Sequence, residues 1–192
     1  MEPSLAKNDK IMFYKYLNSA KVYFEYGSGG STYQAAMKNN ISKIYSVESD
    51  KGWYDKLKNI LIKNTNLQYF YIEMDTQPRT WGSPGPKSTK QQHINYSEQI
   101  KLISKDEQKN IDLVFIDGRF RVACCLKCFD VINDDCLIIF DDFLNRKHYH
   151  VVLKYYDIVE KTIDERMVVL KKKKNISSIP KELIKKYELI RG

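Results

Sequence analysis

Short apolar runs alternate along the chain with segments whose apolar residues have helical spacing. The runs are nearly continuous, which is typical of strands buried on both faces of a sheet. Strands are expected over residues 21–26, 43–49, 67–75, 111–118 and 135–142. Helices are expected over residues 9–20, 31–40, 50–64, 121–132 and 148–165. This alternation predicts an α/β fold, a Rossmann-like doubly wound sheet of parallel strands.

Three further segments complete the pattern. Residues 166–174 (RMVVLKKKK) are expected to finish the sheet as an antiparallel strand, and residues 180–190 to form a short final helix. Residues 76–101 carry three prolines, two glycines and Trp81, and are expected to form a loop insertion on the substrate side. Because an exposed indole is unfavourable, Trp81 indicates that this loop is ordered against another surface.

The composition fits one domain over residues 1–192. With 43% hydrophobic residues the chain is globular, and no stretch reaches the roughly 18 apolar residues of a membrane span. The start of the chain lacks an apolar signal region, and the clustered cysteines indicate reduced thiols, so a cytoplasmic protein is expected. No second pair or nearby histidine completes a zinc site, which favours core packing for the four cysteines, Cys124, Cys125, Cys128 and Cys136.

The net charge of +8 is partly concentrated in a basic C-terminal segment, residues 171–192, which begins KKKK. This charge is compatible with nucleic acid, anionic membranes or phosphorylated substrates. A solvated, lysine-rich surface is the simpler interpretation. The charge alone therefore leaves the partner open.

The first expected strand ends in a glycine-rich turn, EYGSGGST (residues 25–32). At the carboxyl end of a parallel strand, such a turn lets a ligand approach the backbone, and the following helix offers free N–H groups. Dinucleotide, flavin and S-adenosylmethionine sites all share this feature. The spacing here is ExGxGG, and Glu25 argues against a phosphate and for a cationic ligand end. Glu48, which ends the second strand, can accept both hydroxyls of a ribose.

These residues resemble the first motif of class I S-adenosylmethionine-dependent methyltransferases, in which the glycine loop lies beside the methionine moiety of the cofactor. The resemblance covers about residues 10–160 and implies the strand order 3-2-1-4-5. It matches Glu48 to the ribose-binding acid and Asp75 to a residue near the adenine; at Ser31 many members have another glycine. The expected S-adenosylmethionine-binding residues are Glu25, Gly27, Ser28, Gly29, Gly30, Ser31, Thr32, Glu48, Ser49, Asp75 and Asp117.

Three carboxylates follow the last two expected parallel strands: Asp117 after the fourth, and Asp141 and Asp142 after the fifth. Like charges in one crevice resist joint ionisation unless a cation joins them, and oxygen ligands suit Mg²⁺, Mn²⁺ or Ca²⁺. The set resembles that of metal-dependent O-methyltransferases acting on catechols and on sugars, which implies that all three acids are metal ligands. A structural role stays open, with Asp142 as a helix cap and Asp117 shaping the turn.

The base and the acceptor contacts are expected beside these acids. His148 and His150 point about 200° apart on a helix, so at most one faces the site, and His148 is favoured as the base. A surface or helix-packing role is the simpler interpretation of either histidine alone. In the sugar enzymes a further acid stands where this chain has Arg119, so their catalytic base has no counterpart here. The expected catalytic residues are His148, Asp117 and Asp142. The expected substrate contacts are Arg119, Arg121, Trp81 and His150, the arginines for an anionic group.

Taken together, these features predict O-methylation of a sugar hydroxyl on a nucleotide-linked or polymeric glycan, with help from Mg²⁺ or Mn²⁺. One alternative is an RNA or protein methyltransferase that uses the basic segment, although the chain has no Asn/Asp-Pro-Pro-aromatic motif of amino methylation. Another is an inactive module that binds the cofactor. The sequence also leaves room for a homodimer or for a part of a larger multidomain protein.

Overall fold

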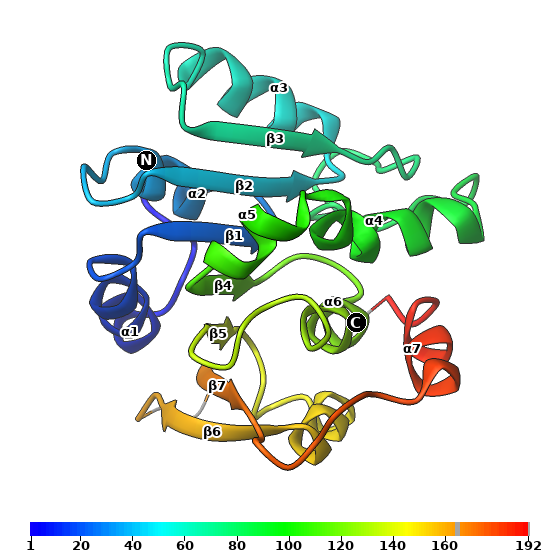
Figure 1. Ribbon diagram of the computed structural model, residues 1–192. Helices are drawn as coiled ribbons and strands as arrows, with labels where there is room; N and C mark the ends of the chain where they lie inside the picture. Colours follow the sequence, from blue (N-terminus) through cyan, green and yellow to red (C-terminus); the bar gives the residue numbers. More distant parts are fainter. Residues whose placement is uncertain (164–165, 192) are drawn as a thin grey trace.

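The computed structural model in Figure 1 describes residues 1–163 and 166–191. Within these residues it contains one sheet, whose strands are β1 (Val22–Tyr26), β2 (Lys43–Glu48), β3 (Leu67–Tyr71), β4 (Leu113–Ile116), β5 (Leu137–Phe140), β6 (Tyr156–Lys161) and β7 (Val168–Lys172). The helices are α1 (Lys7–Leu17), α2 (Gly30–Ala36), α3 (Lys51–Ile60), α4 (Lys90–Leu102), α5 (Lys105–Asn110), α6 (Arg121–Cys128), the 3₁₀ helix η1 (Lys147–Lys154) and α7 (Lys181–Tyr187).

The sheet has the order β3-β2-β1-β4-β5-β7-β6, which confirms the predicted 3-2-1-4-5 arrangement and the antiparallel finishing strand. Strands β1 to β5 are parallel, so their carboxyl ends lie at one edge. Strand β7 runs antiparallel to β5, with Val168 opposite Phe140. The start of β7 therefore lies at the same edge as the carboxyl end of β5, and its lysine-rich end lies at the opposite edge.

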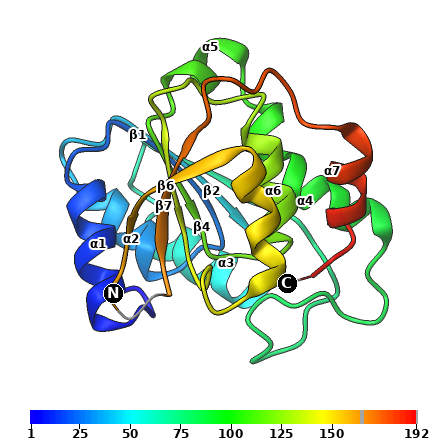
Figure 2. The same cartoon turned by 90° about the horizontal axis from the view of Figure 1, so that it is seen from below.

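Helices cover both faces of the sheet. In β1, Tyr23 packs into the cluster that contains Phe13 of α1, whereas Phe24 packs into the cluster that contains Cys125 of α6. Figure 2 shows α1 and α2 on one side of the sheet, and α4, α6 and α7 on the other. All four cysteines are buried free thiols, as expected of core residues. The longest described helix, α4, has 13 residues, and no described helix is long and apolar enough to cross a bilayer.

The predicted helix over 148–165 is wrong in its second half. Residues 147–154 form η1, but residues 156–161 form β6, which pairs antiparallel with β7; residues 164–165 lie outside the described part of the chain. Without β6, β7 would present an open row of backbone donors and acceptors. Pairing along this edge overrides a local pattern that fits either a helix or a strand.

The predicted loop insertion over 76–101 is also corrected. Residues 90–101 belong to α4, whose capping box joins Thr89 and Gln92. The sequence KQQHINYSEQI conceals this helix because few of its residues are apolar, yet Tyr96 and Ile100 are buried against the core. The third strand ends at Tyr71 instead of residue 75. The irregular segment at the carboxyl edge is therefore limited to residues 72–89, between β3 and α4.

Candidate active site

A pocket of about 360 Å³ opens at the carboxyl edge of the parallel strands. The turns after β1, β2, β4 and β5 contribute to its walls, together with the loop after β3 and the start of the chain. Many residues singled out from the sequence meet here. Its lining includes Gly27, Ser28, Gly29, Gly30, Ser31, Glu48, Ser49, Trp81, Asp117, Arg119, Arg121, Asp141 and Asp142.

The glycine turn packs tightly against the turn that follows β4. Gly27 has a φ of +94°, and a Cβ atom there would lie 2.6 Å from the backbone nitrogen of Gly118. Its N–H donates to the carbonyl of Val47 at 2.9 Å. A Cβ atom on Gly29 would meet nothing within 4 Å. Gly27 is thus required by the backbone, whereas Gly29 leaves space on the pocket side.

Glu25 lies beneath the turn and does not line the pocket. It is fully buried and accepts hydrogen bonds from the hydroxyls of Thr32, Ser46 (2.7 Å) and Tyr23 (2.9 Å). Burial raises its pKa, and these hydrogen bonds oppose the rise. Thr32 in turn accepts from the Gly29 N–H at 2.9 Å. Glu25 and Thr32 therefore hold the turn in shape from behind, which differs from the expected contact with a cationic ligand.

Glu48 stands at the pocket wall with its carboxylate held in place. It accepts hydrogen bonds from three backbone N–H groups, those of Ser28 (2.8 Å), Ser49 (2.6 Å) and Asp50 (2.6 Å). Burial raises its pKa to about 7, although these three donors act to lower it. The carboxylate therefore bridges the turns after β1 and β2.

Beyond Glu48 a second pocket of about 540 Å³ adjoins the first. Trp53 and Trp81 line both pockets, and Trp81 is 69% exposed. Asp75 does not reach either pocket, because its carboxylate accepts the N–H of Lys87 at 2.9 Å inside the loop. Two indoles, instead of the expected Asp75, are thus placed to contact a flat ring next to Glu48. Sequence reasoning missed Trp53, although it lies only five residues beyond Glu48.

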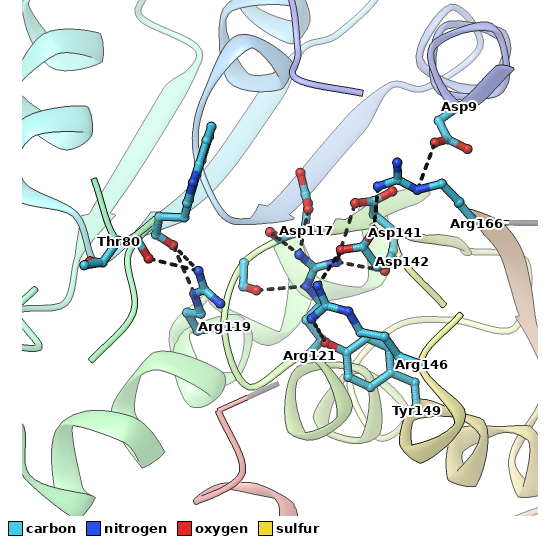
Figure 3. Close-up of polar contacts among 12 residues, drawn as sticks. Asp9, Thr80, Asp117, Arg119, Arg121, Asp141, Asp142, Arg146, Tyr149 and Arg166 are labelled. Carbon is cyan, nitrogen blue, oxygen red and sulfur yellow. Dashed lines mark hydrogen bonds and ion pairs between the residues drawn. The ribbon is translucent and has the colours of Figure 1, made fainter. Parts of the chain in front are cut away.

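The three predicted metal ligands converge, but around a guanidinium group. Arg121 pairs with Asp117 at 2.9 Å, with Asp142 at 3.4 Å and with Asp141 at 3.5 Å, and its side chain is only 9% exposed (Figure 3). Among the described residues no group of three or more His, Cys, Asp or Glu side chains is arranged to hold a metal ion. These residues do not fit a divalent ion, because the guanidinium groups of Arg121, Arg146 and Arg166 already pair with the carboxylates that a metal would need.

The pKa values of Asp117 and Asp142 are shifted in opposite directions. Burial raises the pKa of Asp117 well above its usual range; Arg121 opposes this, and the nearby charges of Asp141 and Asp142 add to it. Burial also acts to raise the pKa of Asp142, but the hydrogen bond from Arg166 and the charges of Arg121 and Arg146 hold it below its usual value. The Oδ1 atom of Asp141 is buried and accepts no hydrogen bond from an N–H or hydroxyl group in the described part of the chain.

Two further arginines reach the same pocket, and sequence reasoning missed both. Arg146 donates to Asp142 at 2.9 Å and to the hydroxyl of Tyr149 at 2.9 Å. Arg166 donates to Asp142 at 2.7 Å (Figure 3). The signal for Arg166 was present, because a strand antiparallel to β5 must begin where β5 ends. Arg146 follows Asp142 by four residues, which would have placed it nearby if the segment continued as a turn or helix.

Arg119 contacts the loop after β3. Its guanidinium donates to the carbonyl of Trp81 at 2.7 and 3.0 Å and to that of Thr80 at 3.2 Å. On the other side of the pocket, the hydroxyl of Ser49 donates to the carbonyl of Gly82 at 3.0 Å. The loop is therefore fastened across the pocket from the ends of β2 and β4. In this structure the side chains of Arg119 and Ser49 therefore bind the loop after β3.

The two histidines lie outside the pocket. His148 is exposed and packs edge-on against Tyr149. His150 stacks on Phe143 and forms a hydrogen bond of 3.2 Å with its carbonyl. Neither lines the pocket, since the 3₁₀ helix η1 turns them away from the acids. The structure gives no support to His148 as a base or to His150 as a substrate contact.

The sequence matches no protein-family model, and no curated protein matches it. Solved structures share the fold. A methyltransferase-like protein from Silicibacter pomeroyi matches with a TM-score of 0.80 and 24% identity, over 97% of this chain and 96% of its own. An O-methyltransferase from Bacillus cereus, in complex with SAH, matches with a TM-score of 0.58 and 11% identity over 89% and 83%. An RNA methyltransferase from Salinibacter ruber, bound to S-adenosyl-L-homocysteine, matches with a TM-score of 0.56 and 11% identity, over 92% of this chain and 98% of its own.

These likenesses define the class of fold: the chain has the Rossmann-like sheet of the S-adenosylmethionine-dependent methyltransferases, with two antiparallel strands at one edge. The structure from S. pomeroyi resembles this chain along nearly the whole length of both. At these identities the resemblance concerns the fold, so the chemistry has to be argued from the pocket.

Proposed function

We propose that this protein binds S-adenosylmethionine in the pocket and transfers its methyl group to a hydroxyl of a polar acceptor, a sugar of a nucleotide-linked or polymeric glycan. The observation that carries this proposal is the placement of Glu48 and the glycine turn on one wall of a pocket whose other wall is charged. In this arrangement the methionine end lies beside Gly27–Ser31, the ribose hydroxyls on Glu48, and the adenine near Trp53 and Trp81.

The cofactor supplies an activated methyl group on a sulfonium. What remains for the chain is to align the acceptor with that methyl group and to accept its proton. Asp117 and Asp141 line the pocket beside the glycine turn and are the groups placed to do this. Asp142 is engaged by three guanidinium groups, so we assign it the holding of those arginines.

We do not include a divalent ion in the reaction, because the residues that would hold it do not fit one. Arg121 lies among the three carboxylates and supplies the positive charge that was expected of Mg²⁺ or Mn²⁺. Methyl transfer is therefore expected to continue at the same rate in EDTA. A loss of activity in EDTA that Mg²⁺ restores would return the metal to the site.

The charged wall supports a polar acceptor more than a flat aromatic one, since Asp117 and Asp141 share the pocket lining with four guanidinium groups. The basic C-terminal segment does not support an RNA acceptor. Its first lysines lie at the opposite edge of the sheet, where Lys171 pairs with Asp135 and Lys172 with Asp134.

Methyl-labelled S-adenosylmethionine tests the proposal when it is incubated with carbohydrate, RNA and protein fractions in the presence and absence of EDTA. Label that enters carbohydrate in both conditions is the expected result. Label that enters RNA or protein instead would contradict the acceptor class. Absence of transfer together with tight cofactor binding would favour the inactive module.

A further inference from the structure

Four arginines, Arg119, Arg121, Arg146 and Arg166, line the acceptor side of the pocket together with Asp117, Asp141 and Asp142. Arg166 is also paired with the buried Asp9, at 4.0 Å. The guanidinium group of Arg119 donates to the loop carbonyls, and that of Arg121 pairs with the three acids. The other two arginines are more exposed than Arg121. The side chain of Arg146 is 35% exposed and that of Arg166 is 45% exposed, whereas that of Arg121 is 9% exposed.

One carboxylate positions both exposed arginines. Arg146 binds Oδ2 of Asp142 at 2.9 Å, and Arg166 binds Oδ1 at 2.7 Å. The hydroxyl of Tyr149 accepts a second bond from Arg146. The backbone of Arg166 is fixed as well, because its carbonyl accepts the N–H of Phe143 at 2.6 Å. Both guanidinium groups are thus oriented by Asp142, each through a different carboxylate oxygen, in the lining of the pocket.

These contacts leave donors unused. A guanidinium group has five N–H donors, and the hydrogen bonds of Arg146 to described residues occupy two of them. Asp142 is shared by both groups, whereas Asp9 pairs with Arg166, so the charge of Arg146 is the less compensated of the two. Two preorganised guanidinium groups with free donors match the oxygens of a carboxylate or phosphate.

A buried carboxylate oxygen belongs to the same pocket, Oδ1 of Asp141. This oxygen accepts no hydrogen bond from an N–H or hydroxyl group of the described residues. The carboxyl of Asp117 is its neighbour, and a hydrogen bond between the two acids helps to raise the pKa of Asp117. A buried carboxylate oxygen without a donor is unfavourable, so a ligand that donates a hydrogen bond to it would be stabilising. The pocket therefore combines the guanidinium donors of Arg146 and Arg166 with a buried acceptor, Oδ1 of Asp141.

We propose that Arg146 and Arg166 bind a carboxylate or phosphate carried by the methyl acceptor, while Asp141 accepts a hydrogen bond from a neighbouring hydroxyl. This inference rests on the proposed function and narrows the acceptor to an acidic sugar, a uronic acid or a sugar phosphate. A neutral sugar can donate to Asp141 but offers no anionic oxygen to the remaining donors of Arg146 and Arg166, so we expect it to bind more weakly than an acidic sugar.

Calorimetric titration of the protein saturated with S-adenosylhomocysteine tests this inference, with glucuronate, glucose 6-phosphate and glucose as probes. At least one of the two anions is expected to bind at least ~10-fold more tightly than glucose. Arg146→Gln and Arg166→Gln are each expected to weaken that anion about 10-fold or more while the affinity for S-adenosylhomocysteine stays within about twofold. Lys147→Gln, which removes the same charge from an exposed neighbour outside the pocket, is the matched control and is expected to change neither.

Each outcome decides a separate point. Binding of glucuronate alone selects a carboxylate, and binding of glucose 6-phosphate alone selects a phosphate. Equal binding of glucose, no binding of either anion, or anion binding that survives both arginine variants would overturn the inference while leaving the proposed function intact. Failure of the wild type to bind S-adenosylhomocysteine would instead overturn the proposed function. If a glutamine variant loses cofactor binding through misfolding, anion binding is measured with Arg146→Lys in its place. This variant keeps the positive charge but lacks the planar, forked donors of a guanidinium group.

Discussion

Single residues at the strand ends set the shape of this pocket, and Gly27 is the one whose geometry is most demanding. Its positive φ is strained for any residue with a side chain, and a Cβ atom would collide with the backbone of Gly118. The glycine turn therefore allows the ends of β1 and β4 to pack closely, and the space beside it is available to a ligand.

Replacement of Gly27 should be costly for stability. Gly27→Ala is expected to lower the free energy of unfolding by about 2 kcal/mol or more, because strain and the clash with Gly118 add. Gly29→Ala is the matched control, since its Cβ atom would meet nothing within 4 Å and its φ of 177° is extended. Urea denaturation measures both; equal midpoints for the two variants would contradict the role of Gly27.

Glu48 predicts a pH dependence of cofactor binding. With a pKa of about 7 the group is largely protonated at lower pH, and a ribose diol needs the ionised form as its acceptor. Affinity for S-adenosylhomocysteine should therefore rise between about pH 6 and about pH 8, by up to ~10-fold for each unit below the pKa. Glu48→Gln should bind more weakly at pH 8 and should lose this dependence. Calorimetry across pH measures it, and a flat wild-type profile would refute the contact.

At the scale of elements, irregular segments and packed helices together close the pocket. The loop of residues 72–89 is fastened by Arg119 and Ser49, and the carbonyl of Pro84 accepts from Arg191 at 3.1 Å, so the end of the chain also braces it. Helix α7 in turn is joined to α6 through Lys127, which is completely buried and pairs with Glu188 at 2.6 Å. Polar contacts from several segments thus brace the loop, and a buried ion pair joins α7 to α6.

Release of the loop should expose it to protease. Arg119→Gln removes three hydrogen bonds to the carbonyls of Thr80 and Trp81. Cleavage by trypsin after the exposed Arg79 is expected to become about 10-fold faster, which is the effect of losing 1–2 kcal/mol of local stability, roughly. Mass spectrometry of timed digests measures the rate at this site, with Lys147→Gln as the charge control. An unchanged rate would show that Arg119 does not hold the loop.

The buried ion pair between α6 and α7 should matter more than an exposed one. Glu188→Gln leaves Lys127 buried with Glu98 at 3.4 Å as its remaining ion-pair partner among the described residues, and is expected to cost ~2–3 kcal/mol. Glu182→Gln, whose partner Lys185 is 67% exposed, should change stability by less than ~0.5 kcal/mol. Chemical denaturation compares the two variants, and equal losses would contradict the difference in burial.

At the scale of the whole molecule, the alternation of apolar runs and helical segments was enough to predict a parallel sheet covered by helices, and the resemblance to class I methyltransferases supplied its strand order. The alternation was also enough to place Glu48, Asp117 and Asp141 in one pocket, because parallel strands end at a common edge. It could not predict that Arg121 would lie among the acids, since that depends on where a side chain folds back from α6. Nor could it predict β6, because this strand forms by antiparallel pairing with β7, and the local pattern of residues 156–161 does not reveal that pairing.

Binding of S-adenosylhomocysteine by the unmodified protein decides whether the pocket was interpreted correctly, since dinucleotides and flavins also use glycine turns. In a calorimetric titration we expect one site per chain with a dissociation constant on the order of micromolar, and no binding of NAD⁺ or FAD at the same concentrations. Binding of a dinucleotide in preference to S-adenosylhomocysteine, or no binding of the latter at millimolar concentration, would contradict the assignment of Glu48 and the glycine turn to this cofactor.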